Sequence, residues 1–267
     1  MCDLLGMCFN LPVKPNFSFK NFRFKDRKNK NGWGIAFYPD NSAQVIKEEI
    51  EASESQLAEM LVNYDYVKSK IVIAHVRASS GTQPSHKNTH PFSRELNGEE
   101  WVFAHNGTLN EDKLKELITE SQFQPLGNTD SELAFCYLLN LIKKRNIKDW
   151  TSGKDFGWLK EIIRKLNEFG TFNCIFSNGN LLFCYADKNQ YNKLSFIQRK
   201  TPFGQIHLLD LDKRHPRQGY VNLGEEKDSA QEGYLISTTD RTGKPTDEKW
   251  TLFNGGELKV FKNGNII

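Results

Sequence analysis

Apolar residues alternate with polar ones, or form short runs, in ten segments that are bounded by turn residues. This pattern is typical of β-strands. It predicts strands over residues 2–9, 34–38, 43–46, 71–76, 101–105, 171–177, 181–185, 205–209, 233–237 and 257–261. Asn10 and Pro12 are expected to end the first strand. Asn178-Gly179 predicts a tight hairpin between the sixth and seventh strands.

Four other segments carry apolar residues at helical spacing. They cover residues 55–64, 110–119, a stretch from about 129 to 145, and 158–169. Asn110 is expected to cap the second helix, and Gly170 to end the fourth. The polar stretch 212–231 is interpreted as a loop. Strands, then helices, then strands favour layered sheets with segregated helices, an α+β class, over a doubly wound parallel sheet.

Composition narrows the class of protein. The chain has 267 residues, of which 38% are hydrophobic and 26% charged, as in soluble globular proteins. No apolar run is long enough to span a bilayer, and no secretory signal is visible, so we expect a cytoplasmic protein that binds no membrane. The five cysteines include no C-x-x-C pair, which indicates reduced thiols. The basic run 25–30 is short and no nucleic-acid module is evident, so nucleic-acid binding is not expected.

Cys2 is the first candidate for chemistry. If Met1 is removed, Cys2 carries a thiol and a free α-amine on one carbon. The amine, with a reference pKa of about 7.7–8.0, is suited to act as a general base for its own thiol. With Met1 attached, that nitrogen is an amide and cannot take a proton.

Four short clusters lie at predicted strand ends or helix starts. Arg77 leaves one strand and is suited to hold a carboxylate with two parallel bonds, although a surface salt bridge is the simpler interpretation. Asn106 and Gly107 leave another strand and offer two donors for an oxyanion, although Asn-Gly is also a common turn pair. Asp130 opens a helix, where it either serves the helix dipole or grips an ammonium group.

His90 belongs to the fourth cluster, Asn88 to Phe92, and a lone histidine is commonly structural. A zinc site made of histidines would use His75, His86, His90 and His105, but it lacks a recognised ligand spacing. No phosphate-binding glycine loop occurs. We therefore expect neither a metal nor a nucleotide cofactor.

Taken together, these motifs resemble a known family. The stretches are MCDLLGMCFN, NGWGIAFY, IAHVRASSG, NTHPF, WVFAHNGTL, GNTDSELAFCYLL and TPFG. In this order and spacing they are similar to the class II glutamine amidotransferases, which are N-terminal-nucleophile hydrolases, and to their stand-alone YafJ-type branch. The resemblance implies a four-layer αββα sandwich of two mainly antiparallel sheets. It also implies one domain over residues 2–267, with the family core over about 2–250 and C-terminal strands to 267.

The resemblance further implies a role for each matching residue. Cys2 would attack the γ-amide of glutamine, and Asn106 with the Gly107 N–H would stabilise the oxyanion. The substrate-binding residues would be Arg77 and Ser80 at the α-carboxylate, Asp130 at the α-ammonium, and His90 lining the pocket. Ser80 stands where several members of the family have threonine.

Three functions remain open at this stage. The first is hydrolysis of glutamine to glutamate and ammonia through a γ-glutamyl thioester, with the ammonia passed to a separate synthase subunit. The second is hydrolysis of another γ-glutamyl amide or peptide. The third is a non-catalytic protein that keeps the fold. The sequence does not indicate an oligomeric state.

Overall fold

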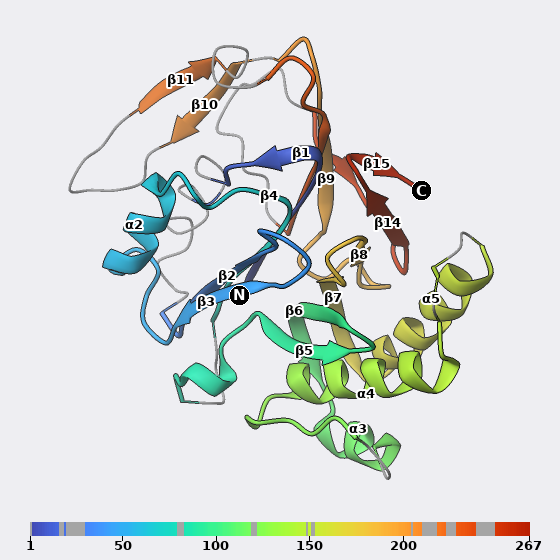
Figure 1. The fold of residues 1–267 in the computed structure, drawn as a ribbon. Coiled ribbons are helices and arrows are strands. Elements are labelled where there is room, and N and C mark those ends of the chain that lie inside the picture. Colours follow the sequence, from blue (N-terminus) through green and yellow to red (C-terminus); the bar gives the residue numbers. More distant parts are fainter. Residues whose placement is uncertain are drawn as a thin grey trace.

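In the computed structural model, the described residues are 2–15, 19, 30–78, 83–118, 122–147, 149–150, 153–203, 205–209, 218–222, 228–238 and 249–267. Most described strands belong to two large antiparallel sheets, and helices cover their outer faces (Figure 1). The α+β class expected from the sequence is therefore confirmed.

The first sheet has seven strands in the order β13-β9-β12-β1-β4-β2-β3. Their bounds are β1 Asp3–Val13, β2 Trp33–Phe37, β3 Gln44–Glu48, β4 Ser69–Val76, β9 Ser195–Arg199, β12 Gly233–Ser237 and β13 Thr251–Leu252. In the antiparallel pair of β1 and β4, Asp3 lies opposite Val76. This register brings the residues just outside the pair, Cys2 and Arg77, to the same end of the sheet.

The second sheet has six strands in the order β15-β14-β8-β7-β6-β5. Their bounds are β5 Phe92–Leu96, β6 Glu99–Leu109, β7 Gly170–Ser177, β8 Leu182–Tyr185, β14 Leu258–Lys262 and β15 Asn265–Ile266. A separate two-stranded sheet pairs β10 (Gln205–Leu209) with β11 (Gln218–Asn222). Besides the 3₁₀ turn η1 (His86–Asn88), the described helices are α2 Gln56–Asn63, α3 Glu111–Leu117, α4 Asp130–Arg145 and α5 Lys154–Asn167.

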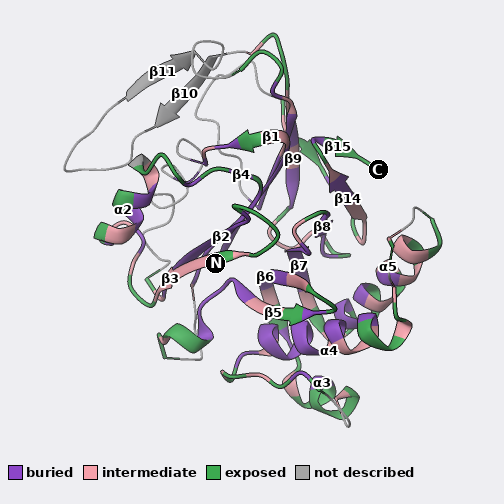
Figure 2. Cartoon of the chain, in the orientation of Figure 1, coloured by how far each residue is buried: buried purple, intermediate pink, exposed green. Residues whose placement is uncertain are grey.

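Three buried clusters separate four layers. Alternate residues of β1 and β4 face opposite ways: Leu5 and Val72 pack toward α2, whereas Leu4 and Ile73 meet residues of the second sheet such as Ala104. The other face of the second sheet packs on α4 and α5 through a third cluster. Burial accordingly concentrates on the strands and on the inner face of α4 (Figure 2). The expected αββα sandwich is confirmed.

Several predicted boundaries are wrong. β1 continues past Asn10 and Pro12 to Val13, because its pairing with β4 shifts register after Cys8 and resumes at Val13. β11 lies inside the stretch 212–231, which was interpreted as a loop, since its backbone pairs with β10 despite its polar sequence. α5 begins at Lys154, four residues before the expected start, and Gly157 lies within it.

No helix in the described part of the chain is long and apolar enough to cross a membrane.

Candidate active site

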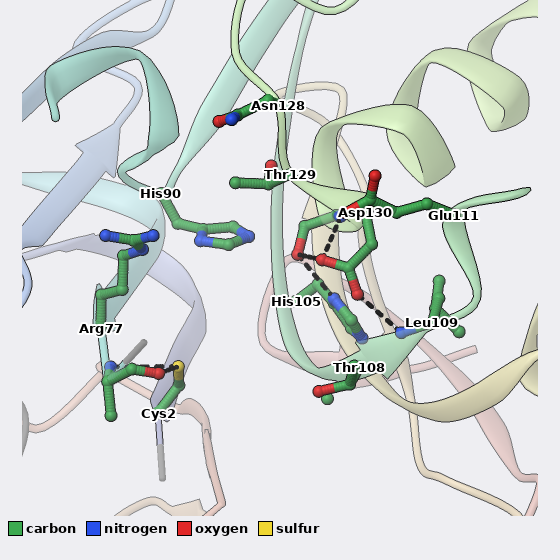
Figure 3. A pocket seen from close by; sticks show the side chains of 13 residues that line it. Cys2, Arg77, His90, His105, Thr108, Leu109, Glu111, Asn128, Thr129 and Asp130 are labelled. Atoms are coloured by element: carbon green, nitrogen blue, oxygen red, sulfur yellow. Dashed lines mark hydrogen bonds between the residues drawn. The ribbon is translucent and has the colours of Figure 1, made fainter. Parts of the chain in front are cut away.

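A cavity of about 200 Å³ lies where β1 and α4 begin and where β4 and β6 end (Figure 3). Its wall is contributed by both sheets and by the α4 N-terminus. The lining residues are Cys2, Arg77, Ala78, His90, His105, Gly107, Thr108, Leu109, Glu111, Asn128, Thr129, Asp130 and Ser131. Five residues that the resemblance assigned to the site, Cys2, Arg77, His90, Gly107 and Asp130, therefore share one cavity.

The Cys2 side chain is held beside Ala78, just after the end of β4. The backbone N–H of Ala78 lies 3.2 Å from the Cys2 sulfur, and the thiol lies 3.2 Å from the Ala78 carbonyl oxygen. The alternation of β1 explains its direction, because Leu4 and Cys8 also face the second sheet. The sulfur is thereby directed to the gap between the sheets.

The environment keeps this thiol protonated. Burial raises the pKa of Cys2, and this effect outweighs the hydrogen bond from Ala78 and the positive charge of Arg77, which both lower it. A protonated thiol is a poor nucleophile at neutral pH. Attack on a substrate therefore requires a base next to the sulfur.

Asn106 comes from β6, on the opposite sheet, and is 1% exposed. Its side-chain amide donates to the Cys2 carbonyl oxygen, and its own side-chain oxygen has no hydrogen-bond partner among the described residues. Asn106 does not line the cavity itself but contacts Cys2, which does. The contact joins the end of the first sheet to the end of the second.

Gly107 follows Asn106 and has no room for a side chain. A Cβ atom there would lie 2.0 Å from the Thr171 carbonyl oxygen and 2.7 Å from Nε2 of His105. The backbone of β6 can therefore pass this close to β7 only with glycine at position 107. The same crowding keeps the Gly107 backbone in the cavity wall, one residue after Asn106.

Arg77 lies on the other side of Cys2. Its backbone N–H donates to the Gly32 carbonyl at 2.8 Å, and its guanidinium Nη1 donates to the Asn31 carbonyl at 3.2 Å. The residue is 4% exposed. A guanidinium fixed in this way presents a positive charge to the cavity with little freedom to move.

The start of α4 forms the far wall. Thr129 caps the helix by accepting from the Glu132 N–H at 3.2 Å. The Asp130 carboxylate accepts from the N–H groups of Leu109 at 2.6 Å and Ser131 at 2.9 Å. Both oxygens are thus oriented by backbone donors, and the negative charge faces the same cavity as Arg77 (Figure 3).

A second contact locks this segment to the loop that carries His90. Asn88 and Asn128 exchange two hydrogen bonds: Asn88 Nδ2 donates to Asn128 Oδ1 at 2.7 Å, and Asn128 N donates to Asn88 Oδ1 at 3.0 Å. A Cβ at Gly127 would lie 2.3 Å from Asn88 Oδ1, so this pairing requires glycine there. These hydrogen bonds therefore hold the motifs NTHPF and GNTDSE together, and we call the pair the Asn88–Asn128 clasp.

Three buried histidines lie beside the cavity. The rings of His75 and His90 are 4.2 Å apart, and none of their nitrogens has a partner among the described residues. Burial lowers the pKa of His75 to about 3 and the pKa of His90 well below its usual value. The third ring, His105, is held by Ser131 Oγ at 2.8 Å from Nδ1 and by the Thr171 carbonyl at 3.2 Å from Nε2.

These histidines are neutral at pH 7, so the charged side chains in the cavity wall are those of Arg77, Glu111 and Asp130. The zinc alternative also included His86, which is exposed on η1 and apart from the trio. The described residues contain no cluster of three or more histidine, cysteine or acidic side chains that could hold a metal ion.

Ser80, expected at the carboxylate, lies outside the described residues, and so do residues 25–29 of the basic run. The cavity residues Thr108, Asn128 and Ser131 belong to motifs named from the sequence, but the sequence assigned them no role. Ser131 had a usable signal, since it directly follows Asp130 in the first turn of α4. The Asn88–Asn128 clasp had none, because it joins residues 40 positions apart.

Comparison with known proteins identifies the family. The family model described as class-II glutamine amidotransferases matches residues 1–267. An uncharacterized protein of Methanocaldococcus jannaschii is 44% identical over 100% of this chain and 71% of its own length. The putative glutamine amidotransferase YafJ of Escherichia coli is 34% identical over 100% of both chains.

A solved structure agrees with these sequence relatives. The crystal structure of a predicted glutamine amidotransferase from Pseudomonas aeruginosa superposes with a TM-score of 0.70, at 26% identity, and covers 100% of this chain and 99% of that one. The resemblance inferred from the motifs is confirmed, and so is the fold expected for an N-terminal-nucleophile hydrolase. The chain belongs to the class-II glutamine amidotransferase family.

Proposed function

We propose that the protein hydrolyses the γ-amide of glutamine to glutamate and ammonia, with Cys2 as the nucleophile after removal of Met1. One observation carries the proposal: a thiol, a guanidinium and a carboxylate, from Cys2, Arg77 and Asp130, line a single cavity. A free α-amino acid carries one carboxylate and one ammonium group, and its γ-amide extends away from both. The cavity offers a partner for each of the two charges and a sulfur for the amide.

The chemistry follows from the state of the thiol. In the mature protein the Cys2 α-amine accepts the thiol proton as sulfur bonds to the γ-carbonyl carbon. The resulting oxyanion receives hydrogen bonds from the Asn106 amide and the Gly107 N–H. The amine then passes the proton to the departing nitrogen. The C–N bond breaks, ammonia departs, and a γ-glutamyl thioester remains on Cys2. Water adds to the thioester and releases glutamate and the thiol.

Charged side chains bind the α-carboxylate and the α-ammonium group of the substrate. The Arg77 guanidinium pairs with the α-carboxylate, and Asp130 pairs with the α-ammonium. His90 lines the cavity as a neutral ring. We propose Ser80 as a second group that binds the α-carboxylate of the substrate. A cavity of about 200 Å³ is small beside the 300–1,000 Å³ usual for drug-sized ligands, which favours a free amino acid over a large conjugate.

The experiment compares glutamine with a panel of γ-glutamyl peptides, using glutamate release by wild type and Cys2→Ala. Glutamine turnover by wild type and none by Cys2→Ala is the expected result. Faster turnover of a γ-glutamyl peptide would replace glutamine as substrate but keep the mechanism. No turnover of any compound by protein lacking Met1 would leave the non-catalytic alternative. We also propose a cytoplasmic protein of one catalytic domain over residues 2–267 that passes ammonia to a separate synthase subunit.

A further inference from the structure

The Cys2 carbonyl oxygen receives a second hydrogen bond that the mechanism above does not use. Asn192, on the loop between β8 and β9, donates its side-chain amide to this oxygen at 3.1 Å. Asn106 donates to the same atom from β6. A carbonyl oxygen has two lone pairs, so the two amides together satisfy it fully.

The loop that carries Asn192 is itself firmly built. Its base is Asp187, which is 0% exposed and accepts from the N–H groups of Asn189 at 2.8 Å and Tyr191 at 3.1 Å. Asn173 donates to the Tyr191 carbonyl at 2.6 Å. Because Asn173 lies opposite Asn106 in the β6–β7 pair, the loop is fixed to the same strands that carry Asn106.

The backbone at position 192 also favours asparagine. Asn192 has φ of 42°, in the left-handed region that asparagine and glycine tolerate better than most residues. Asparagine therefore fits the turn and supplies an amide donor at its tip. Asn192 does not line the cavity, and its side-chain amide is directed to the Cys2 carbonyl oxygen.

We propose that Asn192 is a positioning residue for the N-terminal nucleophile. After Met1 is removed, Cys2 is the end of the chain and precedes the first paired residue of β1, Asp3. Asn192 keeps its carbonyl in place while the Asn106 amide turns one N–H to the oxyanion. Without Asn192, that movement leaves the Cys2 carbonyl unpartnered and the nucleophile free to shift. The inference rests on the proposed function for its catalytic part.

Two substitutions separate this role from a role in the turn. Asn192→Gly keeps the left-handed backbone and removes the side-chain amide. Asn192→Asp keeps the size of the side chain but places a carboxylate, which cannot donate a hydrogen bond, next to the Cys2 carbonyl oxygen. Loss of a neutral hydrogen bond predicts a kcat about 3- to 10-fold lower for Asn192→Gly, and a larger loss for Asn192→Asp. KM for glutamine should stay within about twofold for both. The matched control is Asn97→Gly, an exposed left-handed asparagine in the β5–β6 turn, with φ of 58°.

Alkylation of the thiol gives a readout that does not depend on turnover. The other four cysteines are buried, so iodoacetamide reports on Cys2. A loosened Cys2 exposes its sulfur, and alkylation of Asn192→Asp should be at least about threefold faster than in wild type and Asn97→Gly. Alkylation and kcat both within twofold of wild type would overturn the inference. If wild type itself fails to hydrolyse glutamine, the proposed function fails, and the alkylation rates alone decide the role of Asn192.

Discussion

The backbone N–H of Ala78 lies 3.2 Å from the sulfur of Cys2. The two residues are 76 positions apart in the sequence, and they meet because β1 and β4 pair antiparallel with Asp3 opposite Val76. An N–H aimed at sulfur stabilises a thiolate as it forms, and burial opposes ionisation before substrate arrives. The sheet register therefore determines the state of the proposed nucleophile.

Asn106→Ala should lower kcat by about 100-fold or more, because one of the two oxyanion donors is lost. KM should change little, since the oxyanion forms only as the thiol adds to the amide and is absent from bound glutamine. Steady-state glutamate release measures both constants. Asn106→Asp serves as the matched variant, because it keeps the size of the side chain but removes its N–H donors. Full activity in Asn106→Asp would place the oxyanion elsewhere.

Gly107→Ala should abolish most activity, because its Cβ would lie 2.0 Å from the Thr171 carbonyl and force the backbone away from the cavity. Gly98→Ala, in the turn before β6, is the control: Gly98 has φ of +78° but nothing within 4 Å of its Cβ position. That control should lose about 1–2 kcal/mol of folding free energy, because alanine is strained at positive φ, and it should keep its kcat. Parallel urea unfolding and glutamine assays test the pair, and equal kcat losses in both variants would contradict the assignment of Gly107.

Asp130→Asn should remove the ability to select an α-ammonium group. Wild type is expected to prefer glutamine over its analogue without the α-amine, glutaramic acid, by about 10-fold or more in kcat/KM, and the variant should lose most of that preference. Asp112→Asn, an exposed acid in the first turn of α3, is the control. An unchanged preference in Asp130→Asn would show that another group receives the ammonium.

Acid should destabilise the fold through the buried histidines. The pKa of His75 is lowered to about 3 by burial, with smaller contributions from His105 and Arg77, whereas an unfolded histidine titrates near 6.5. Below pH 6.5 the unfolded chain binds the proton and the folded chain does not, so stability falls by about 1.4 kcal/mol per pH unit for this group, down to its folded pKa. Urea unfolding of wild type and His75→Gln between pH 7 and 4.5 measures the difference. Parallel curves for the two proteins would contradict it.

Much of the fold was predictable because its strands are locally regular. Segments with clear alternation, such as β4, or with a strong turn signal, such as Asn178-Gly179 between β7 and β8, lie close to the ranges expected. β5 and β9 were missed because their short sequences, FSREL and SFIQR, show mixed burial and no clean period. β11 was missed because it lies within a polar stretch of sequence, although its backbone pairs with β10.

Some features of the site could also be predicted from the sequence, and others could not. Cys2, Arg77 and Asp130 were named because each lies beside a strand end or at a helix start, and the structure brings all three to one cavity. The contacts that hold them were not predictable. Asn192 reaches a residue 190 positions away, and the Asn88–Asn128 clasp depends on close packing at Gly127, which no local pattern encodes.

The most direct test of Cys2 as an N-terminal nucleophile is mass spectrometry of the protein after reaction with an electrophilic glutamine analogue, one in which a diazoketone replaces the amide. We expect one adduct, on Cys2, in a peptide that begins with Cys2 and lacks Met1, and competition by glutamine should suppress it. An adduct on another residue, or glutamine turnover by protein that retains Met1 on every chain, would contradict it.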